Sequence, residues 1–517
     1  MLTDAFLVEF IVFKIHRSLC LFLGCTATTL FCSLPTAQAI TAQSHPLEGS
    51  QIAVAYQLPG SNEVYGVNSD IYFHPASTQK LITALAASLF LGNDYTIKTR
   101  LQVQQQALNI GTDQKASLKL SPEGILQSDV TIRFSADPTL TIEGYRKLLS
   151  TLQQQGVKRI AGNVNLDVSR VGTPIRAQGW NWADIPSCFT APASAVVLNR
   201  NCTFIELTNQ GPGTRAQPKI PAGLPLKVIS DAIAVDNRDY GGDCELEINL
   251  YQGNEYHLSG CIPADNNGKP FPLSLDVSDP VAWGVSWTQK LLTSMGIGVD
   301  GNVQAIRHPS NDVTTIAEIK SKPLGELIRY MLMRSNNLYA DAIAKNTAAE
   351  YYSLPATYNR TARALRSILS QYADIDLNAA YLVDASGLSA HNLLTARELL
   401  AVLAYMKAHD EELHLIDMLP VAGKSGTLHW RASTVNAPLK LNVIAKTGTL
   451  QNVSNLAGFV RTKSGALAPF VMFTNAITYS ERIRDRVKFR RMASPHLGYE
   501  RYVLENIYAQ KVMGRDF

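Results

Sequence analysis

A serine and a lysine lie three residues apart in the stretch 73–80, which reads FHPASTQK. Pro75 suits the first turn of a helix, and the apolar run 81–91 repeats at the spacing of a buried helical face. Residues three apart share one face of a helix, so the Lys80 amine can reach the Ser77 hydroxyl and take its proton. The free N–H groups and the positive end of the first turn favour an oxyanion beside this serine. The stretch therefore predicts an activated serine nucleophile.

Two later stretches add the groups that such a nucleophile needs. Residues 335–337 (SNN) follow the apolar segment 324–333, and residues 446–449 (KTGT) follow the strand-like run 439–445. At average residue usage S-x-x-K occurs by chance about once or twice in a chain of this length, and K-T-G only about once in ten such chains. The order S-x-x-K, S-x-N, K-T-G is the motif set of penicillin-binding proteins and serine β-lactamases. The three motifs together therefore indicate a serine acyl-transfer enzyme.

A second sequence competes for the third motif. Residues 424–427 (KSGT) have the same pattern, but they lie in a turn-rich stretch with no apolar strand before them. We therefore assign the third motif to Lys446.

The composition is that of an ordinary globular protein. The chain has 517 residues, of which 46% are hydrophobic and 17% are charged, enough for two or three domains. A formal net charge of +4 is too small to indicate a nucleic-acid partner, and the sequence contains no P-loop, HExxH or zinc-spaced Cys/His set. The basic run 482–491 is interleaved with apolar residues, which favours a solvated face over a membrane or cell-wall contact.

The N-terminus predicts export. Lys14 and Arg17 precede the apolar stretch 19–34, and the Ala-Gln-Ala at 37–39 is a small-residue cleavage site. We interpret residues 1–39 as a secretory signal and expect a periplasmic or cell-envelope protein. No transmembrane segment is predicted in the mature chain.

Removal of the signal leaves four cysteines. An even number in an oxidising compartment indicates two disulfides, and of the three pairings we favour the sequence-local Cys188–Cys202 and Cys244–Cys261. The alternative is that the four cysteines are small buried residues.

The pattern along the chain predicts a catalytic domain interrupted by an insertion. Residues 40–115 contain a strand, a turn and a strand before the Ser77 helix, and residues 309–517 contain long helices followed by neighbouring strands. Residues 116–308 between them show short strands and turns with two helices. The segments 148–164 and 282–303 share the order helix, Gly-Val, Gly-Asn-Val, which suggests inserted α/β units of similar build.

The exported chain resembles the class C low-molecular-mass penicillin-binding proteins, which are D-alanyl-D-alanine carboxypeptidases and endopeptidases with a large insertion after the S-x-x-K helix. Beyond the three motifs, the resemblance includes the stretches 136–140 (ADPTL), 191–195 (APASA), 198–201 (LNRN), 384–389 (DASGLS) and 455–458 (NLAG). It implies an α/β fold of the serine β-lactamase and penicillin-binding-protein type, in which helices flank an antiparallel sheet, with a large inserted α/β region.

The resemblance implies that peptidoglycan peptides are hydrolysed through an acyl-enzyme on Ser77, which penicillin also forms, without a metal or organic cofactor. Lys80 is the expected base. Asn337 is expected to hold Lys80 and the substrate amide, and Ser335 is expected to relay a proton to the leaving amine.

The third motif is expected to bind the substrate. Lys446 with Thr447 and Thr449 would hold the terminal carboxylate, and Gly448 lies between them. The backbone N–H groups of Ser77 and Thr449 would form the oxyanion hole.

The sequence departs from the family pattern in the residues that read the substrate side chain. Ala390 stands where the family commonly has an arginine, whereas Asp167 and Gln451 match other positions of that pocket. Asp167 follows a predicted strand, so its carboxylate either faces the substrate at the strand end, where it would attract a free amino group, or is a solvated turn residue.

Two other functions stay open at this point. A serine β-lactamase shares the motifs, although Ser-Asn-Asn as the second motif counts against a class A enzyme. A non-catalytic binding protein on the same fold is the other alternative, but the chain has kept Ser77, Lys80 and Lys446. The sequence does not decide between carboxypeptidase and endopeptidase preference, or whether the protein forms a homo-oligomer.

Overall fold

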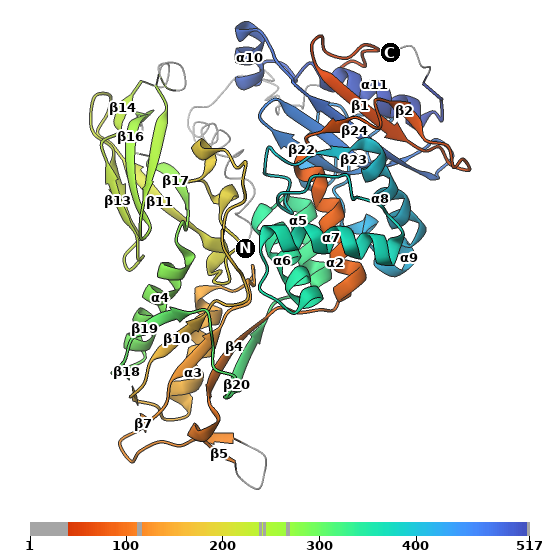
Figure 1. Ribbon diagram of the computed structural model, residues 1–517. Coiled ribbons are helices and arrows are strands. Elements are labelled where there is room, and N and C mark those ends of the chain that lie inside the picture. Colours follow the sequence, from red (N-terminus) through yellow and green to blue (C-terminus); the bar gives the residue numbers. More distant parts are fainter. Residues whose placement is uncertain (1–39, 111–115, 237–239, 241–243, 265–268, 514–517) are drawn as a thin grey trace, which may run out of the picture.

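The computed structural model describes residues 40–110, 116–236, 240, 244–264 and 269–513 (Figure 1). The predicted signal peptide, at residues 1–39, lies outside these ranges. Within them, no helix combines the length and the apolar character that a membrane crossing needs.

The domain that carries the three motifs is built on one antiparallel sheet. Its strands, in spatial order, are β2 (Tyr65–Val67), β1 (Gln51–Tyr56), β24 (Leu467–Asn475), β23 (Val453–Arg461) and β22 (Val443–Leu450). All six residues of β1 pair with β24, which joins the N-terminal hairpin to the C-terminal strands. Successive side chains point to opposite faces: Ala53 and Ala55 pack in one core cluster, whereas Val54 and Tyr56 pack in another. The sheet is therefore buried on both faces.

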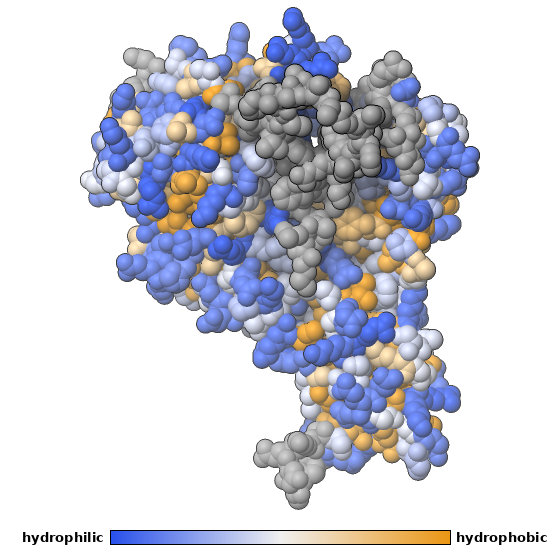
Figure 2. Space-filling model, turned by 180° about the vertical axis from the view of Figure 1, so that it is seen from behind, coloured by the Kyte–Doolittle hydropathy of each residue, from blue (hydrophilic) through white to orange (hydrophobic). Residues whose placement is uncertain are grey.

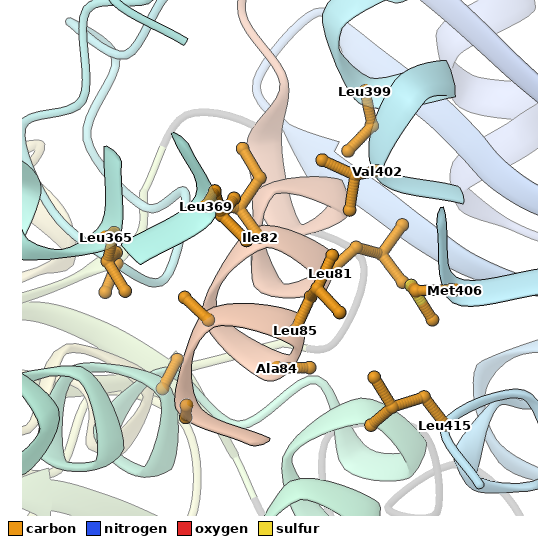
Figure 3. Packing of buried hydrophobic residues seen from close by; sticks show 14 of the residues in the cluster. Leu81, Ile82, Ala84, Leu85, Leu365, Leu369, Leu399, Val402, Met406 and Leu415 are labelled. Carbon is orange, nitrogen blue, oxygen red and sulfur yellow. The ribbon is translucent and has the colours of Figure 1, made fainter. Parts of the chain in front are cut away.

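Helices provide both of these cores. The larger core contains α2 (Lys80–Leu91), α5 (Leu324–Arg334), α6 (Asn337–Tyr352), α7 (Tyr358–Ala373) and α8 (Ala396–Ala408), and the smaller contains α11 (Leu497–Tyr508). Residues 80–88 of α2 are buried on every side. Figure 3 shows Leu81 of α2 beside Val402 and Met406 of α8, and Ile82 beside Leu369 of α7. Burial of each leucine or isoleucine side chain of α2 stabilises the fold by about 2 kcal/mol. The helix α2 is therefore a rigid support for Ser77, which lies just before it.

The inserted region has two parts. The first is a sheet of β19 (Val303–Ile306), β10 (Val164–Asp167), β8 (Val130–Arg133), β4 (Lys98–Gln104) and β20 (Val313–Lys320), packed with α3 (Ile142–Gln154) and α4 (Pro280–Ser294). The second part consists of two small sheets. One contains β12 (Gln217–Lys219), β11 (Cys202–Thr208) and β17 (Phe271–Asp276). The other contains β13 (Lys227–Ser230), β16 (Glu255–Pro263), β14 (Ile233–Val235) and β15 (Leu246–Tyr251). Figure 1 shows both parts on one side of the catalytic domain.

Short elements complete the described chain. They are β3 (Tyr72–Phe73), β5 (Leu108–Ile110), β6 (Ala116–Leu118), β7 (Ile125–Leu126), β9 (Arg159–Ile160), β18 (Gly298–Val299), β21 (Leu394–Thr395), α9 (Asp410–Leu413) and α10 (Glu481–Lys488). The helix α10 carries most of the basic run and has no buried residue, as expected for a solvated face. Figure 2 shows the reverse side of the molecule, where hydrophilic residues are spread widely with hydrophobic patches between them.

The inserted region is longer than the predicted range 116–308. Strand β4 pairs with β8 and β20, so the two strands that lead out of and back into the catalytic domain belong to the inserted sheet. The region therefore spans residues 98–320. The boundary is set by hydrogen bonds between strands that are far apart in the sequence, which no local pattern encodes.

The two similar segments of the insertion form equivalent units. Val164 in β10 pairs in parallel with Val303 in β19, and Arg159 in β9 pairs in parallel with Gly298 in β18. Each unit consists of a helix followed by these two strands, so the expectation of α/β units of similar build is confirmed.

Two strand predictions need correction. The strand predicted at 439–445 begins at Val443 and continues to Leu450, so the third motif lies within β22 rather than after it. The single strand predicted before Asp167 is divided into β9 and β10, which belong to different sheets.

Both disulfides form as favoured. Cys188 is bonded to Cys202 with Cα atoms 5.2 Å apart, and Cys244 to Cys261 with Cα atoms 5.8 Å apart. Both lie in the inserted region. The Cys188–Cys202 disulfide links the segment around Cys188 to the start of β11.

Candidate active site

The first two motifs meet at the amino group of Lys80, and the third meets the second at Ser335. The Nζ of Lys80 lies 2.8 Å from Ser77 Oγ and donates to Asn337 Oδ1 at 2.7 Å and to the Ser386 carbonyl at 2.6 Å. Lys80 is fully buried, whereas Ser77 is half-buried. The amine is therefore held by protein atoms on three sides and directed at a hydroxyl that a substrate can reach.

The helix start that carries the serine differs from the prediction in detail. Residues 76–79 form a 3-10 turn, and α2 proper begins at Lys80. Ala76 has a φ of 47°, a left-handed conformation that is uncommon for a residue with a side chain. Such strain is maintained at functional sites where the surrounding packing enforces it.

Two glycines supply that packing. A Cβ on Gly387 would lie 1.9 Å from the Ala76 carbonyl oxygen, and Gly387 itself has a φ of 76°. A Cβ on Gly448 would lie 2.8 Å from the Pro75 carbonyl oxygen. The glycine of the third motif therefore allows β22 to approach the nucleophile turn.

The S-x-N spacing follows from a tight junction between α5 and α6. Ser335 ends α5 in a left-handed conformation, with a φ of 53°. Asn336 then caps α6, because its side chain accepts the Tyr339 N–H at 3.0 Å. This reversal points Ser335 Oγ at Lys446 and Asn337 Oδ1 at Lys80.

Lys446 is the second buried amine. Its Nζ donates to Ser335 Oγ at 2.8 Å and to the Thr447 carbonyl at 2.7 Å. Burial, followed by the positive charges of Lys80 and Arg431, holds its pKa well below the usual value for lysine. The sequence 424–427 has different surroundings, since Lys424 is exposed and only Thr427 reaches the motif, accepting a hydrogen bond from Thr447 Oγ1 at 2.8 Å.

The environment of Lys80 favours its neutral form near neutral pH. Burial lowers the pKa of Lys80 to about 7, although the negative charges of Asp384 and Asp341 oppose this shift. A neutral amine beside a serine hydroxyl can accept its proton.

The loop that contains Ser386 is fixed by one carboxylate. Asp384 Oδ1 accepts the Gly387 N–H at 2.8 Å, and Oδ2 accepts the Ser389 N–H at 2.7 Å. Asn392 Nδ2 also donates to Oδ1 at 2.9 Å, and the indole Nε1 of Trp180 donates to Oδ2 at 2.9 Å. Trp180 belongs to the inserted region, so the insertion helps to hold the loop whose carbonyl binds Lys80.

A cavity of about 320 Å³ opens at the nucleophile. Its lining residues are Ser77, Asp184, Phe189, Ser335, Asn337, Gly387, Leu388, Thr449, Leu450 and Gln451. Asp184 and Phe189 come from the insertion, and the Phe189 carbonyl accepts from Asn337 Nδ2 at 2.9 Å. Neither residue is predicted from the sequence, nor is Trp180, because no local pattern links them to the motifs.

The predicted substrate-binding residues are distributed unevenly around this cavity. Thr449 and Gln451 line it, whereas Thr447 is bonded to Thr427 and Gly448 packs against the nucleophile turn. Ser77 and Thr449 both line the cavity, and their N–H groups stay the predicted oxyanion hole.

Asp167 occupies neither of the surroundings that were predicted for it. It ends β10 as expected, but its side chain is 1% exposed and lies 3.6 Å from Arg133, and it is not among the lining residues of the cavity. The reason is that β10 runs in the middle of the inserted sheet, between β8 and β19. The acidic side chain in the cavity lining is that of Asp184.

Comparisons with known proteins agree with this geometry. The sequence profile of the D-Ala-D-Ala carboxypeptidase 3 (S13) family matches residues 36–492. The chain is 32% identical over 492 residues to a D-alanyl-D-alanine carboxypeptidase, DacB, of Haemophilus influenzae. The aligned region covers 94% of this chain and 98% of that protein. It is 27% identical over 419 residues to a D-alanyl-D-alanine carboxypeptidase of an Actinomadura species, covering 78% of this chain and 74% of that protein.

Solved structures show the same relationship. The crystal structure of penicillin binding protein 4 from Haemophilus influenzae is similar with a TM-score of 0.80 and 32% identity, over 90% of this chain and 97% of that one. The same protein in complex with a β-lactam is similar with a TM-score of 0.77. The chain therefore has the expected fold of the penicillin-binding proteins. It belongs to the D-Ala-D-Ala carboxypeptidase 3 (S13) family.

Proposed function

We propose that the protein hydrolyses the terminal D-Ala-D-Ala bond of peptidoglycan peptides through an acyl-enzyme on Ser77. The observation that carries this proposal is the buried Lys80 amine, 2.8 Å from the Ser77 hydroxyl oxygen and with a pKa of about 7. A serine hydroxyl becomes a good nucleophile when a neutral base stands within hydrogen-bond reach.

In acylation, Ser77 Oγ forms a bond to the carbonyl carbon of the penultimate D-Ala, and its proton passes to Lys80 Nζ. The oxyanion is stabilised by the N–H groups of Ser77 and Thr449. When the C–N bond breaks, the amine of the terminal D-Ala takes a proton through Ser335, whose Oγ lies 2.8 Å from Lys446 Nζ. Water then hydrolyses the ester and frees Ser77.

The substrate carboxylate is assigned to the Lys446 side of the cavity. A carboxylate near Lys446 favours the charged form of that lysine, whereas burial disfavours it. Thr449 lines the same cavity and can donate a hydrogen bond.

Endopeptidase activity and export are the finer parts of the proposal. Cleaving a cross-link uses the same acyl-enzyme, with a larger leaving group in place of D-Ala. Two disulfides and a substrate that lies outside the cytoplasmic membrane both support an exported protein.

The other two functions receive less support. Both curated relatives named above are carboxypeptidases rather than β-lactamases. A non-catalytic binding protein does not require a lysine whose pKa is tuned to the range of general-base catalysis.

Penicillin acylation tests the nucleophile. We expect intact-mass measurement to show one penicillin adduct on the protein and none on Ser77→Ala, because Ser77 is the hydroxyl that contacts Lys80. An adduct on Ser77→Ala would show that another residue is the nucleophile. Rapid turnover of penicillin without a trapped adduct would favour a β-lactamase.

The pH dependence of acylation tests the base. We expect the rate constant for penicillin acylation to rise as the pH increases through about 7 and to level off above it, because Lys80 must be neutral to accept the proton. Asp384→Asn and Asp341→Asn each remove a negative charge that favours the ammonium, so the midpoint should move to lower pH.

Asp374→Asn is the control for that experiment, since Asp374 is exposed and asparagine tolerates its left-handed conformation. Its midpoint should equal that of the original protein. Thermal unfolding of each variant identifies any loss of fold. A midpoint that moves upward in both buried variants would contradict the assignment of Lys80 as the base.

The two K-[ST]-G sequences make different predictions. Lys446→Ala should lower kcat/KM for D-Ala-D-Ala peptides by roughly 30-fold or more, because losing a buried charge partner costs on the order of 2–5 kcal/mol. Lys424→Ala should leave kcat/KM close to that of the original protein, because Lys424 is exposed. The reverse result would mean that the third motif is at 424–427.

Side-chain preference tests the acidic residue of the cavity. We expect Asp184→Asn to lower kcat/KM about fivefold for a peptide with a free side-chain amine, and to have little effect on the same peptide after acetylation. Asp167→Asn is the matched variant and should affect both peptides equally, since Asp167 is buried beside Arg133. Selectivity in Asp167→Asn rather than Asp184→Asn would restore the original assignment.

A further inference from the structure

A second cavity lies between the inserted region and the catalytic domain. Its volume is about 890 Å³, compared with about 320 Å³ for the cavity at Ser77. The inserted region contributes residues 138–141 and the start of β11, and the catalytic domain contributes one side of α5. Figure 1 shows α5 and α6 on the side of the catalytic domain that faces the insertion.

The two cavities share their supporting elements. Met333 and Arg334 at the end of α5 line the second cavity, and the next residue, Ser335, lines the first. The Cys188–Cys202 disulfide of the insertion also connects the two cavities. Cys202 lines the second cavity, and Cys188 precedes Phe189, which lines the first.

A strained turn presents an arginine to the second cavity. Asn199, Arg200 and Asn201 all have left-handed φ values, between 47° and 62°. The Asn201 side chain holds this turn by donating to the Pro192 and Val196 carbonyls, each at 3.0 Å. The turn is the LNRN stretch of the sequence, to which the proposed reaction assigns no role.

The Arg200 side chain reaches across the cavity to the catalytic domain. Its guanidinium donates to the Tyr330 hydroxyl of α5 at 2.9 Å. The Tyr330 ring lies 4.4 Å from the ring of Tyr339 on α6, and both tyrosines line the cavity. One wall therefore combines an arginine with two aromatic rings.

The lining carries a clear excess of positive charge. Its basic residues are Arg200, Lys322, Arg329 and Arg334, and its acidic residue is Glu326. Lys322, just before α5, pairs with Glu326 at 2.8 Å, and Arg329 of α5 donates to the Asp417 carbonyl at 3.0 Å. An anionic, extended ligand complements this surface.

We propose that the second cavity binds the carboxylate-bearing second peptide of a cross-linked peptidoglycan substrate. The inference rests on the proposed function, because it concerns the part of the substrate that the cavity at Ser77 is too small to hold. A cross-linked substrate consists of two anionic peptides joined by the bond that is cleaved, so the second peptide is the leaving group. The second needs a separate binding surface beside Ser335, and the basic cavity along α5 provides one.

The experiment compares two substrates in the full-length protein. We measure kcat/KM for a cross-linked peptide dimer and for a short N-acylated D-Ala-D-Ala tripeptide, and form the ratio of the first to the second. In Lys322→Glu combined with Arg329→Glu, two exposed cations of the second cavity are reversed, and we expect the ratio to fall about tenfold. Arg334 is left unchanged because it precedes Ser335.

The control reverses the same amount of charge elsewhere. Arg363 on α7 and Lys407 on α8 are exposed and lie outside the lining of both cavities, so Arg363→Glu combined with Lys407→Glu should keep the original ratio. An unchanged ratio in the cavity variant, or an equal fall in both variants, would overturn the proposal.

A chemical change to the ligand tests the recognised group. A dimer whose carboxylates are amidated except the one next to the cleaved bond, which is assigned to Lys446, should be cleaved by the original protein with about the ratio seen for the cavity variant. Equal kcat/KM for the acid and amidated dimers would also overturn the proposal. The ratios are taken from proteins that form the Ser77 penicillin adduct, so failure of the proposed function appears in the adduct and failure of the second site appears in the ratio.

Discussion

The structure of the site depends on one buried amine. Lys80 is fully buried, and its amino group contacts Ser77, Asn337 and the carbonyl of Ser386, which come from three separate segments of the chain. Placing a lysine in this position is unfavourable for its charged form, which is why its pKa falls to about 7. The same burial that costs stability therefore favours the neutral amine that the proposed reaction needs as its base.

The inserted region contributes to the site directly. Trp180 donates to Asp384, which fixes the loop that binds Lys80, and the Phe189 carbonyl accepts from Asn337. Lys345, buried in α6, donates to the Ala193 carbonyl of the insertion at 2.8 Å and lies over the Tyr358 ring. The Trp180 and Lys345 contacts are buried and polar, so separating the two regions would leave unpaired groups in both. The insertion is therefore part of the catalytic unit as well as a candidate surface for substrate.

Local sequence pattern predicted most of the helices and strands around the site. The apolar run after Lys80 predicted a buried helix. Residues 80–88 of α2 are buried, because exposing its leucine and isoleucine side chains to water would be unfavourable. The pattern was less informative where pairing decides the structure. The third motif lies inside β22 because Val443–Leu450 pairs with β23 in full, and β4 belongs to the inserted sheet because it pairs with β20.

The sequence by itself determined the class of reaction, and it predicted the nucleophile and its base, because S-x-x-K places two groups together within one turn. It also predicted the partners Ser335, Asn337 and Lys446, through the order of the motifs. Only the tertiary structure placed Asp184 at the cavity and Asp167 away from it, and only it showed the role of Trp180. The physical reason is that these positions depend on how the insertion packs against the catalytic domain, and contacts between segments hundreds of residues apart leave no periodicity in the sequence.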